Sequence, residues 1–253
     1  MAKPGVSIVM SCYNSESTMD KAIESICNQT FSNFEFLIID DGSTDNTLEK
    51  LSDWSSKDDR IILIKNERNI GLAASLNKGI EKARATYIAR MDADDEALPK
   101  RLELQVAYLL NNRHIDLLGT AIIRRNKRHE IIGKTILPEQ HEEIIKRVFR
   151  KTLVFHPTIM AKKSLFEIHG MYDPKLKWAE DADLWYRIYD KSQFANLKEP
   201  LLIYTVKDRL TLRQARMNLS VKISNLKRRK RLVSFLPVIA FDILLLSKKV
   251  AGI

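Results

Sequence analysis

The chain has 253 residues, of which 45% are hydrophobic and 29% are charged. This composition is ordinary for a globular protein with a sizeable core, and it excludes collagen-like, fibrous and wholly disordered classes. The two cysteines, Cys12 and Cys27, do not form a Cys-x-x-Cys pair, so we expect reduced thiols as in a cytoplasmic protein. The first residues lead directly into an apolar, strand-like run, and we therefore expect no signal peptide.

The net charge of +10 is distributed unevenly along the chain. Residues 1–206 contain 30 Lys and Arg against 30 Asp and Glu, whereas residues 207–253 contain 12 Lys and Arg against only Asp208 and Asp242. A neutral body followed by a basic tail indicates that the tail has a partner of its own. We therefore predict two functional regions, a body over 1–206 and a tail over 207–253.

Strand-like and helix-like runs alternate through the first part of the body. Continuous β-branched and apolar runs predict strands that are buried on both faces, and apolar residues at helical spacing predict the helices between them. In chain order the predicted elements are a strand Val6–Cys12, a helix Ser17–Gln29, a strand Phe34–Ile39, a helix Asn46–Lys57, a strand Ile61–Lys65, a helix Gly71–Arg84 and a strand Thr86–Met91. Repeated strand–helix units favour an α/β fold with a mostly parallel sheet.

After Asp95 the alternation becomes less regular. The elements predicted there are a helix Pro99–Asn112, paired strands Asp116–Arg124 and Glu130–Ile136, a helix Pro138–Arg150, a strand Val154–Ala161, a helix Glu180–Asp190 and a last strand Leu201–Val206. We expect these elements to complete the same domain as the first part of the body.

Three of the predicted strands end in polar or acidic residues. The first is followed by Ser11–Asn14, the second by Asp40–Ser43 and the fourth by Asp92–Asp95. Ligands in open α/β sheets bind beyond the carboxyl ends of the strands. Carboxylates that follow two strands of one sheet repel each other, and a cation or hydrogen-bond donors are needed to offset this repulsion. Asp and Gly also punctuate ordinary turns, so solvated turns are the alternative interpretation.

The two common glycine-rich phosphate cradles are absent from the sequence. Neither G-x-G-x-x-G nor G-x-x-x-x-G-K-[ST] occurs, which excludes Rossmann dehydrogenases and P-loop NTPases. A phosphate-bearing ligand would need another positive partner. Mg²⁺ or Mn²⁺ held by Asp92 and Asp94 would supply one, because such ions bind one or two carboxylates together with phosphate oxygens.

Five segments resemble, in order and spacing, the signatures of inverting glycosyltransferases of family 2. They are SIVMSCYN, QTFSNFEFLIIDDGSTDNT, NERNIGLAASLNKGI, YIARMDADD and AEDADLWYRI, and the resemblance extends from about Val6 to Tyr204. It implies the GT-A fold, a Rossmann-like, mostly parallel sheet flanked by helices, of the kind found in bacterial polysaccharide and O-antigen synthesis. It also implies a nucleotide-sugar-binding half over 1–98 and an acceptor half over 99–206.

The resemblance implies roles for the polar strand ends. Tyr13 and Asp41, with Ser11 beside them, would contact the base and ribose of a nucleotide, usually uridine. Asp92 would contact the ribose or the metal, and Asp94 would hold Mg²⁺ or Mn²⁺. These residues together would bind the nucleotide-sugar donor.

The resemblance also implies that Asp181 is the catalytic base that removes a proton from the acceptor hydroxyl. Glu180 and Asp181 would equally suit the acidic start of a helix, and the sequence leaves open whether the helix dipole lowers the pKa of Asp181 or burial raises it. His156 would be either a packed histidine or a contact to diphosphate or acceptor. Arg187 would pair either with a nearby acid or with the diphosphate.

Together these features predict an inverting, metal-dependent transferase that moves one sugar from a UDP-sugar to a lipid-linked glycan; GDP remains open as the nucleotide. The Q-x-x-R-W motif and membrane spans of processive synthases are not found in the sequence. A sugar-1-phosphate nucleotidyltransferase is the alternative enzyme, although it would carry a glycine-rich, arginine-bearing loop where this chain has SCYNSES. The non-enzymatic alternative is an inactive adaptor with a basic tail.

The tail combines a basic run with an apolar one. Lys227–Arg231 precedes Leu232–Leu246, in which 12 of 15 residues are apolar. As a helix the apolar run would measure about 22 Å, short of the ~30 Å hydrocarbon core, which disfavours a transmembrane span. We predict peripheral attachment to an anionic membrane surface, the cytoplasmic inner face of the cell membrane. A helix packed on the body or an oligomer contact is the alternative, and nucleic-acid binding is not expected.

Overall fold

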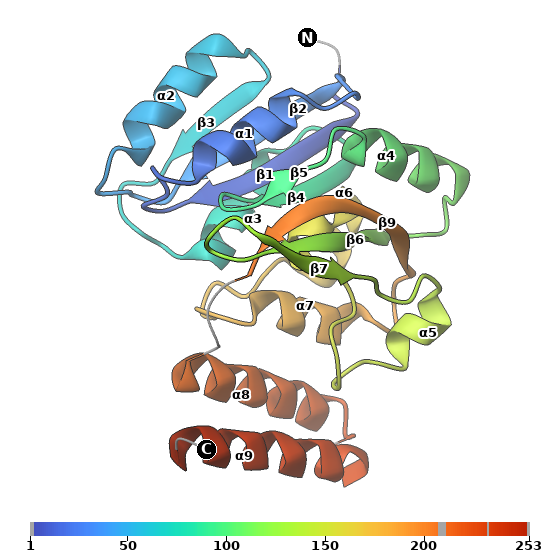
Figure 1. Cartoon of the computed structure of the whole chain (residues 1–253). Helices are drawn as coiled ribbons and strands as arrows, with labels where there is room; N and C mark the ends of the chain where they lie inside the picture. Colours follow the sequence, from blue (N-terminus) through green and yellow to red (C-terminus); the bar gives the residue numbers. More distant parts are fainter. Residues whose placement is uncertain (1–2, 207–210, 232, 252–253) are drawn as a thin grey trace.

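The computed structural model describes residues 3–206, 211–231 and 233–251, and these residues form one mixed sheet flanked by helices (Figure 1). Asp208 and Leu232 of the predicted tail lie outside the described residues. The strands, in chain order, are β1 (Val6–Cys12), β2 (Phe34–Asp40), β3 (Ile61–Lys65), β4 (Tyr87–Asp92), β5 (Glu96–Ala97), β6 (Leu117–Arg125), β7 (Ile131–Thr135), β8 (Met160–Lys162) and β9 (Phe194–Thr205). Their order in the sheet is β3-β2-β1-β4-β8-β6-β9-β5, with β7 paired to β6.

The described part of the chain has nine α-helices. They are α1 (Met19–Cys27), α2 (Thr47–Lys57), α3 (Leu72–Lys82), α4 (Arg101–Asn111), α5 (His141–Ile145), α6 (Lys163–His169), α7 (Glu180–Ile188), α8 (Leu212–Arg228) and α9 (Leu236–Ala251), with short 3-10 turns η1 (His156–Thr158) and η2 (Val233–Phe235). Helices α1, α2 and α4 supply the apolar core on one face of the sheet, and α3, α6 and α7 supply the core on the other. Helices α8 and α9 lie beyond α7 and away from the sheet (Figure 1).

The first four strands pack against apolar cores on both faces, which explains why their sequences are continuously apolar. Successive side chains of a strand point to opposite faces, and in β1 Val9 joins one core whereas Ile8 and Met10 join the other. Strand β1 pairs in parallel with both β2 and β4, and β2 pairs in parallel with β3. The predicted α/β class with a mostly parallel sheet is confirmed.

Three elements of the second half differ from their prediction. The last strand, predicted over Leu201–Val206, is observed as β9 over Phe194–Thr205. Val154–Ala161 does not form one strand, because Pro157 has no N–H for a ladder and the chain turns through η1 before β8 begins at Met160. The predicted helix Pro138–Arg150 contains only α5, since Phe149 has a φ of 61° that an α-helix does not accommodate.

The tail forms two packed helices, with the basic run at the end of α8 and just after it, and most of the apolar run in α9. Figure 1 shows α8 beside α7 and α9 beyond α8, and contacts join each neighbouring pair. The Asn225 amide of α8 donates a hydrogen bond to Asp183 Oδ1 of α7 at 2.9 Å. Among the described helices, none has both the length and the apolar character needed to cross a membrane. Helix α8 of the tail therefore packs on the body, which is the arrangement that the sequence left as an alternative.

Candidate active site

The predicted donor residues lie together at the carboxyl edge of the sheet. The parallel registers place Ser11 beside Asp92 of β4 and Cys12 beside Asp40 of β2, so the three strand ends are level. Ser11, Tyr13 and Asp41 line one cavity of about 720 Å³, which is within the usual size of a small-ligand pocket. Two loops complete its wall, 69–72 and 174–178.

Asp41 is held by hydrogen bonds from the loop opposite. Its carboxylate accepts from the Asn66 amide, from Ile70 N and from Gly71 N, each at 2.9 Å. A carboxylate has about four acceptor positions, so Asp41 retains capacity for a ligand hydroxyl. The same bonds fix the start of α3, and Asp41 therefore shapes the cavity that it also lines.

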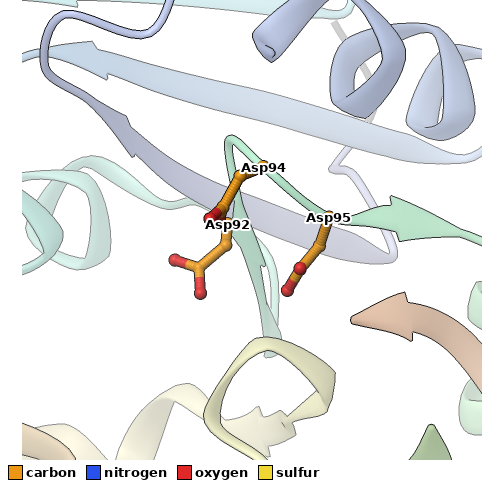
Figure 2. Close-up of side chains that lie close together, drawn as sticks. All are labelled: Asp92, Asp94 and Asp95. Carbon is orange, nitrogen blue, oxygen red and sulfur yellow. The ribbon is translucent and has the colours of Figure 1, made fainter. Parts of the chain in front are cut away.

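Three carboxylates gather in the turn that follows β4. Ligand atoms of Asp92, Asp94 and Asp95 all lie within 4.8 Å of one another, and Figure 2 shows the three side chains extending to the same side of the turn. Burial, together with the negative charges of Asp92 and Asp94, raises the pKa of Asp95 to about 8. One Asp95 oxygen accepts from Thr205 N at 2.8 Å, and the buried Oδ2 has no hydrogen-bond partner among the described residues.

These residues fit a divalent cation. Mg²⁺ and Mn²⁺ take hard oxygen ligands, and a buried carboxylate oxygen without a partner requires a compensating group. Asp92 and Asp94 lie where the sequence placed the metal ligands. Asp95 belongs to the same acidic run but was not predicted as part of this set.

Arg90 links this cluster to the predicted base. Its buried guanidinium forms an ion pair with Asp92, and its positive charge also acts on Glu180 and Asp181 at the start of α7. Asp92 acts on the same two acids with the opposite sign. The metal-ligand candidates and the predicted base therefore share one electrostatic environment, and Arg90 is a site residue that the sequence reading missed.

Burial decides the pKa question that the sequence left open at the start of α7. It raises the pKa of Asp181, and burial together with the Asp181 charge raises the pKa of Glu180 to about 7. Desolvation is thus the largest influence on the pKa of both acids, and the backbone hydrogen bonds that lower these pKa values do not offset it. The preceding residue, Ala179, adopts the left-handed conformation with φ 63°, a strained geometry of the kind that concentrates at functional sites.

Glu180 and Asp181 have different surroundings. Asp181 lines a second cavity of about 500 Å³ that lies against α8 and α9. Glu180 is buried, and its Oε1 lies 3.8 Å from Nδ1 of His156, whose Nε2 lies 2.8 Å from the hydroxyl oxygen of Tyr172. Of the two acids, Asp181 is the one that reaches a cavity.

His156 and Arg187 both serve the packing of the body. Burial lowers the pKa of His156 well below its usual value, so the ring is neutral and is held by Tyr172. Arg187 Nε donates to Asp183 at 2.8 Å, and its guanidinium also donates to the carbonyls of His169 and Met171. Of the alternatives for these residues, the packed histidine and the acid-paired arginine describe the structure.

The fold and the site define an α/β protein with a ligand cavity and a carboxylate cluster at the carboxyl edge of its sheet. Residues 7–169 match the family Glycosyl transferase family 2, and the chain belongs to this family. An uncharacterized glycosyltransferase of Methanocaldococcus jannaschii, MJ1057, is 42% identical over 214 residues, covering 83% of this chain and 73% of that protein. The O-antigen biosynthesis glycosyltransferase WbnJ of Escherichia coli is 35% identical over 215 residues, covering 83% of each chain.

A shorter match is to a relative whose name states its donor, acceptor and linkage. The UDP-Glc:alpha-D-GlcNAc-diphosphoundecaprenol beta-1,3-glucosyltransferase WfgD of Escherichia coli is 37% identical over 135 residues, which is 53% of this chain and 52% of WfgD.

Solved structures with the same fold include two bound to nucleotide sugars. TarS 1–349 of S. aureus in complex with UDP-GlcNAc has a TM-score of 0.70 at 18% identity, covering 92% of this chain and 72% of that one. The mannosyltransferase PcManGT of Pyrobaculum calidifontis, in complex with GDP-Man and Mn²⁺, has a TM-score of 0.66 at 15% identity, covering 94% and 69%. These likenesses confirm the expected GT-A fold.

Proposed function

We propose that this glycosyltransferase moves one sugar from a UDP-sugar to a lipid-linked glycan, with a divalent cation and with inversion at the anomeric carbon. The observation that carries the proposal is the common electrostatic environment of the carboxylate cluster at 92–95 and Asp181, joined by buried Arg90. A transferase of this class needs a cation at the leaving diphosphate and a proton acceptor at the attacking hydroxyl, side by side.

The donor is assigned to the cavity lined by Ser11, Tyr13 and Asp41. Tyr13 is half exposed there and offers an aromatic ring to a base, while Asp41 offers acceptors to ribose hydroxyls. TarS with UDP-GlcNAc and the name of WfgD, which uses UDP-Glc, support uridine. PcManGT with GDP-Man keeps guanosine as the second candidate.

Asp92, Asp94 and Asp95 would hold the cation. When bound, Mg²⁺ or Mn²⁺ would neutralise the charge that develops on the leaving nucleoside diphosphate. The chain's own contribution is to keep three carboxylates within one small volume, with Arg90 and Thr205 N orienting Asp92 and Asp95.

Asp181 would accept the proton of the acceptor hydroxyl as that oxygen attacks the anomeric carbon. Its raised pKa makes the carboxylate a better proton acceptor than an ordinary aspartate, and its position on the lining of the second cavity supports this role. A single displacement on an α-linked donor yields a β-linked product, the linkage in the name of WfgD.

Attachment of the tail to an anionic, cytoplasm-facing membrane surface belongs to this proposal. Exposed Lys227, Arg228 and Lys230 supply charge, while α9 exposes a series of large apolar side chains: Leu236, Phe241, Ile243, Leu244 and Leu245. The basic run is nevertheless divided, because Arg229 pairs with Asp190 and Arg231 donates to the Tyr189 hydroxyl.

A donor screen with bacterial membrane extract as the acceptor tests this function. We expect release of UDP, dependent on Mn²⁺ or Mg²⁺, for one or few UDP-sugars, together with a labelled lipid-extractable product. Release of pyrophosphate from a nucleoside triphosphate and a sugar phosphate would instead identify a nucleotidyltransferase. Absence of both donor binding and donor turnover across UDP- and GDP-sugars would identify an inactive adaptor.

A further inference from the structure

The body and the tail together build the cavity that contains Asp181. Its wall combines α7, α8, α9 and the segment 150–154. At about 500 Å³ it has the size of a small-ligand site, large enough for a sugar and the first part of an attached chain. The tail contributes apolar side chains to the lining, namely Leu219 of α8 and Leu245 and Leu246 of α9.

Cationic side chains from both the tail and the body also line this cavity. Lys222 of α8 is paired with Asp242 of α9, and this ion pair ties the two tail helices together at the cavity. Arg150 and Lys151 line the cavity from the body side and are exposed. An anionic group entering the cavity would therefore meet Arg150 and Lys151.

Aromatic packing fixes the backbone beside Arg150, whose guanidinium also lies 5.5 Å from the centre of the Phe235 ring. Phe149, the residue before Arg150, has the left-handed φ of 61° and is fully buried. Its ring lies 4.4 Å from that of Tyr186 and 5.3 Å from that of Phe235, so it joins the turn to α7 and to η2 of the tail. A strained conformation persists only where its surroundings impose it, so the position of Arg150 is determined by this packing.

The apolar wall continues to the outside of the molecule. Leu245 lines the cavity and is 50% exposed, and its neighbours Ile243 and Leu244 are each 52% exposed on the same helix. Helix α9 is also the outermost helix of the tail in Figure 1. An apolar surface that begins inside a cavity with cations and ends on an exposed helix is complementary to an amphiphile with an anionic head and a hydrocarbon chain.

We propose that this cavity binds the phosphate-bearing end of a polyisoprenyl diphosphate acceptor, whose sugar then faces Asp181. The phosphates contact Arg150 and Lys151, and the first isoprenoid units lie along Leu219, Leu245 and Leu246. The inference rests on the proposed function, because it takes Asp181 as the group that meets the acceptor. It gives the tail a second task, since the tail then forms the acceptor site and does not only attach the protein to a membrane.

Farnesyl diphosphate is the probe, and its binding to the full-length protein is followed by the fluorescence of Trp185, which lines the cavity. Leu245→Glu and Leu244→Glu form a matched pair, because the two leucines are adjacent and equally exposed, and only Leu245 lines the cavity. We expect Leu245→Glu to weaken binding about tenfold or more, since the bound chain would desolvate the new carboxylate. Leu244→Glu should remain within about twofold.

A second pair tests the cations. Arg150→Gln is expected to weaken farnesyl diphosphate about fivefold to tenfold, as for a charge-assisted contact, whereas Lys146→Gln, on an exposed lysine outside the cavity, should have no effect. Inorganic diphosphate and farnesol should each bind much more weakly than the joined molecule. Inorganic diphosphate that binds as tightly as farnesyl diphosphate would reduce the cavity to an anion site and overturn the proposal.

The outcomes separate this inference from the proposed function. If the protein glycosylates a lipid-linked acceptor while both leucine variants bind farnesyl diphosphate equally, the cavity is not the lipid site and the function stands. If binding depends on Leu245 and Arg150 while no nucleotide sugar is consumed under any condition, the lipid site stands and the transferase function is wrong.

Discussion

The donor cavity and the tail-side cavity of this protein are assembled in opposite ways. The donor cavity takes Ser11, Tyr13 and Asp41 from the ends of neighbouring parallel strands, whose register makes those ends level. The tail-side cavity takes its walls from four segments that meet only when α8 packs on α7 and α9 packs on α8. Strand pairing places the first site, whereas helix packing places the second.

The acids of the two cavities also differ in their hydrogen-bond partners. Asp41 is surrounded by donors, because two backbone N–H groups and an amide hydrogen-bond to its oxygens and fix the position of the carboxylate. Asp181 accepts one bond from Ala182 N and is otherwise desolvated, which raises its pKa. The first arrangement is suited to binding hydroxyls and the second to accepting a proton.

The largest effect is expected at the acid of the tail-side cavity. Asp181→Asn should reduce turnover by roughly 10²–10⁴ while donor affinity changes only a few-fold, because the amide keeps the shape and loses the proton acceptor. Initial rates and UDP-sugar binding measure the two quantities. Glu180→Gln should cost about tenfold or less, because Glu180 is directed to His156. Near wild-type turnover in Asp181→Asn would place the base elsewhere.

On the donor side, Asp94→Ala should remove the part of donor affinity that depends on a divalent cation, a loss of more than about a hundredfold at saturating Mn²⁺. Titration of UDP with and without Mn²⁺ measures this part. The control is Asp53→Ala, an exposed acid of α2 distant in sequence from the cluster, which should titrate as wild type. Equal UDP affinity with and without Mn²⁺ in the wild type would refute the cation assignment.

The tail's charge can be removed without disturbing its packing. Replacing Lys227, Arg228 and Lys230 by Gln should weaken binding to anionic liposomes by about 10², at about 1 kcal/mol for each cation near the surface. Co-sedimentation at low and high salt measures the loss. The control removes three exposed cations of the donor half: Lys57, Lys65 and Arg68.

Within the same basic run, Arg229 contributes to the packing of the tail, whereas the exposed cations contribute only charge. Its guanidinium pairs with Asp190 and donates to the carbonyls of Tyr186 and Arg187. Arg229→Gln should therefore lower the melting temperature, whereas the triple Gln variant should not. A full-length protein that ignores anionic liposomes even at low salt would leave the tail as a packing element alone.

The smallest effect is a dependence of stability on pH. Burial and Asp181 raise the pKa of Glu180 from 4.5 to about 7, so the folded state keeps a proton that the unfolded state has released in this range. The free energy of unfolding then decreases as pH rises between these two values and levels off above them. Glu180→Gln cannot titrate, so its melting temperature should fall less than that of the wild type between about pH 5 and pH 7.5, by a few degrees. The comparison uses Glu143→Gln, on an exposed acid, as a control.

The donor half could be read from the sequence because its signals are local. Strands buried on both faces require continuous apolar runs, and the first four strands were predicted within a residue or two of their observed ends. Since the parallel strands end at one edge, the acids that follow them had to gather there. Asp95 and Arg90 were not predicted as site residues. An acid in a turn and an arginine in a strand are recognised as site residues only when their burial is known, and burial depends on the fold.

The tail side could not be read in the same way. The α/β class, the strand-end acids and a basic, apolar tail could be predicted from the chain alone, because charge and apolar periodicity are properties of short segments. Three features depended on the folded arrangement: Arg229 binds α7 and Arg231 binds Tyr189 just after it, Phe149 interrupts the predicted helix, and Asp181 lines a cavity shared with the tail. These outcomes depend on which distant surfaces pack together and exclude water, and no local pattern of residues encodes that.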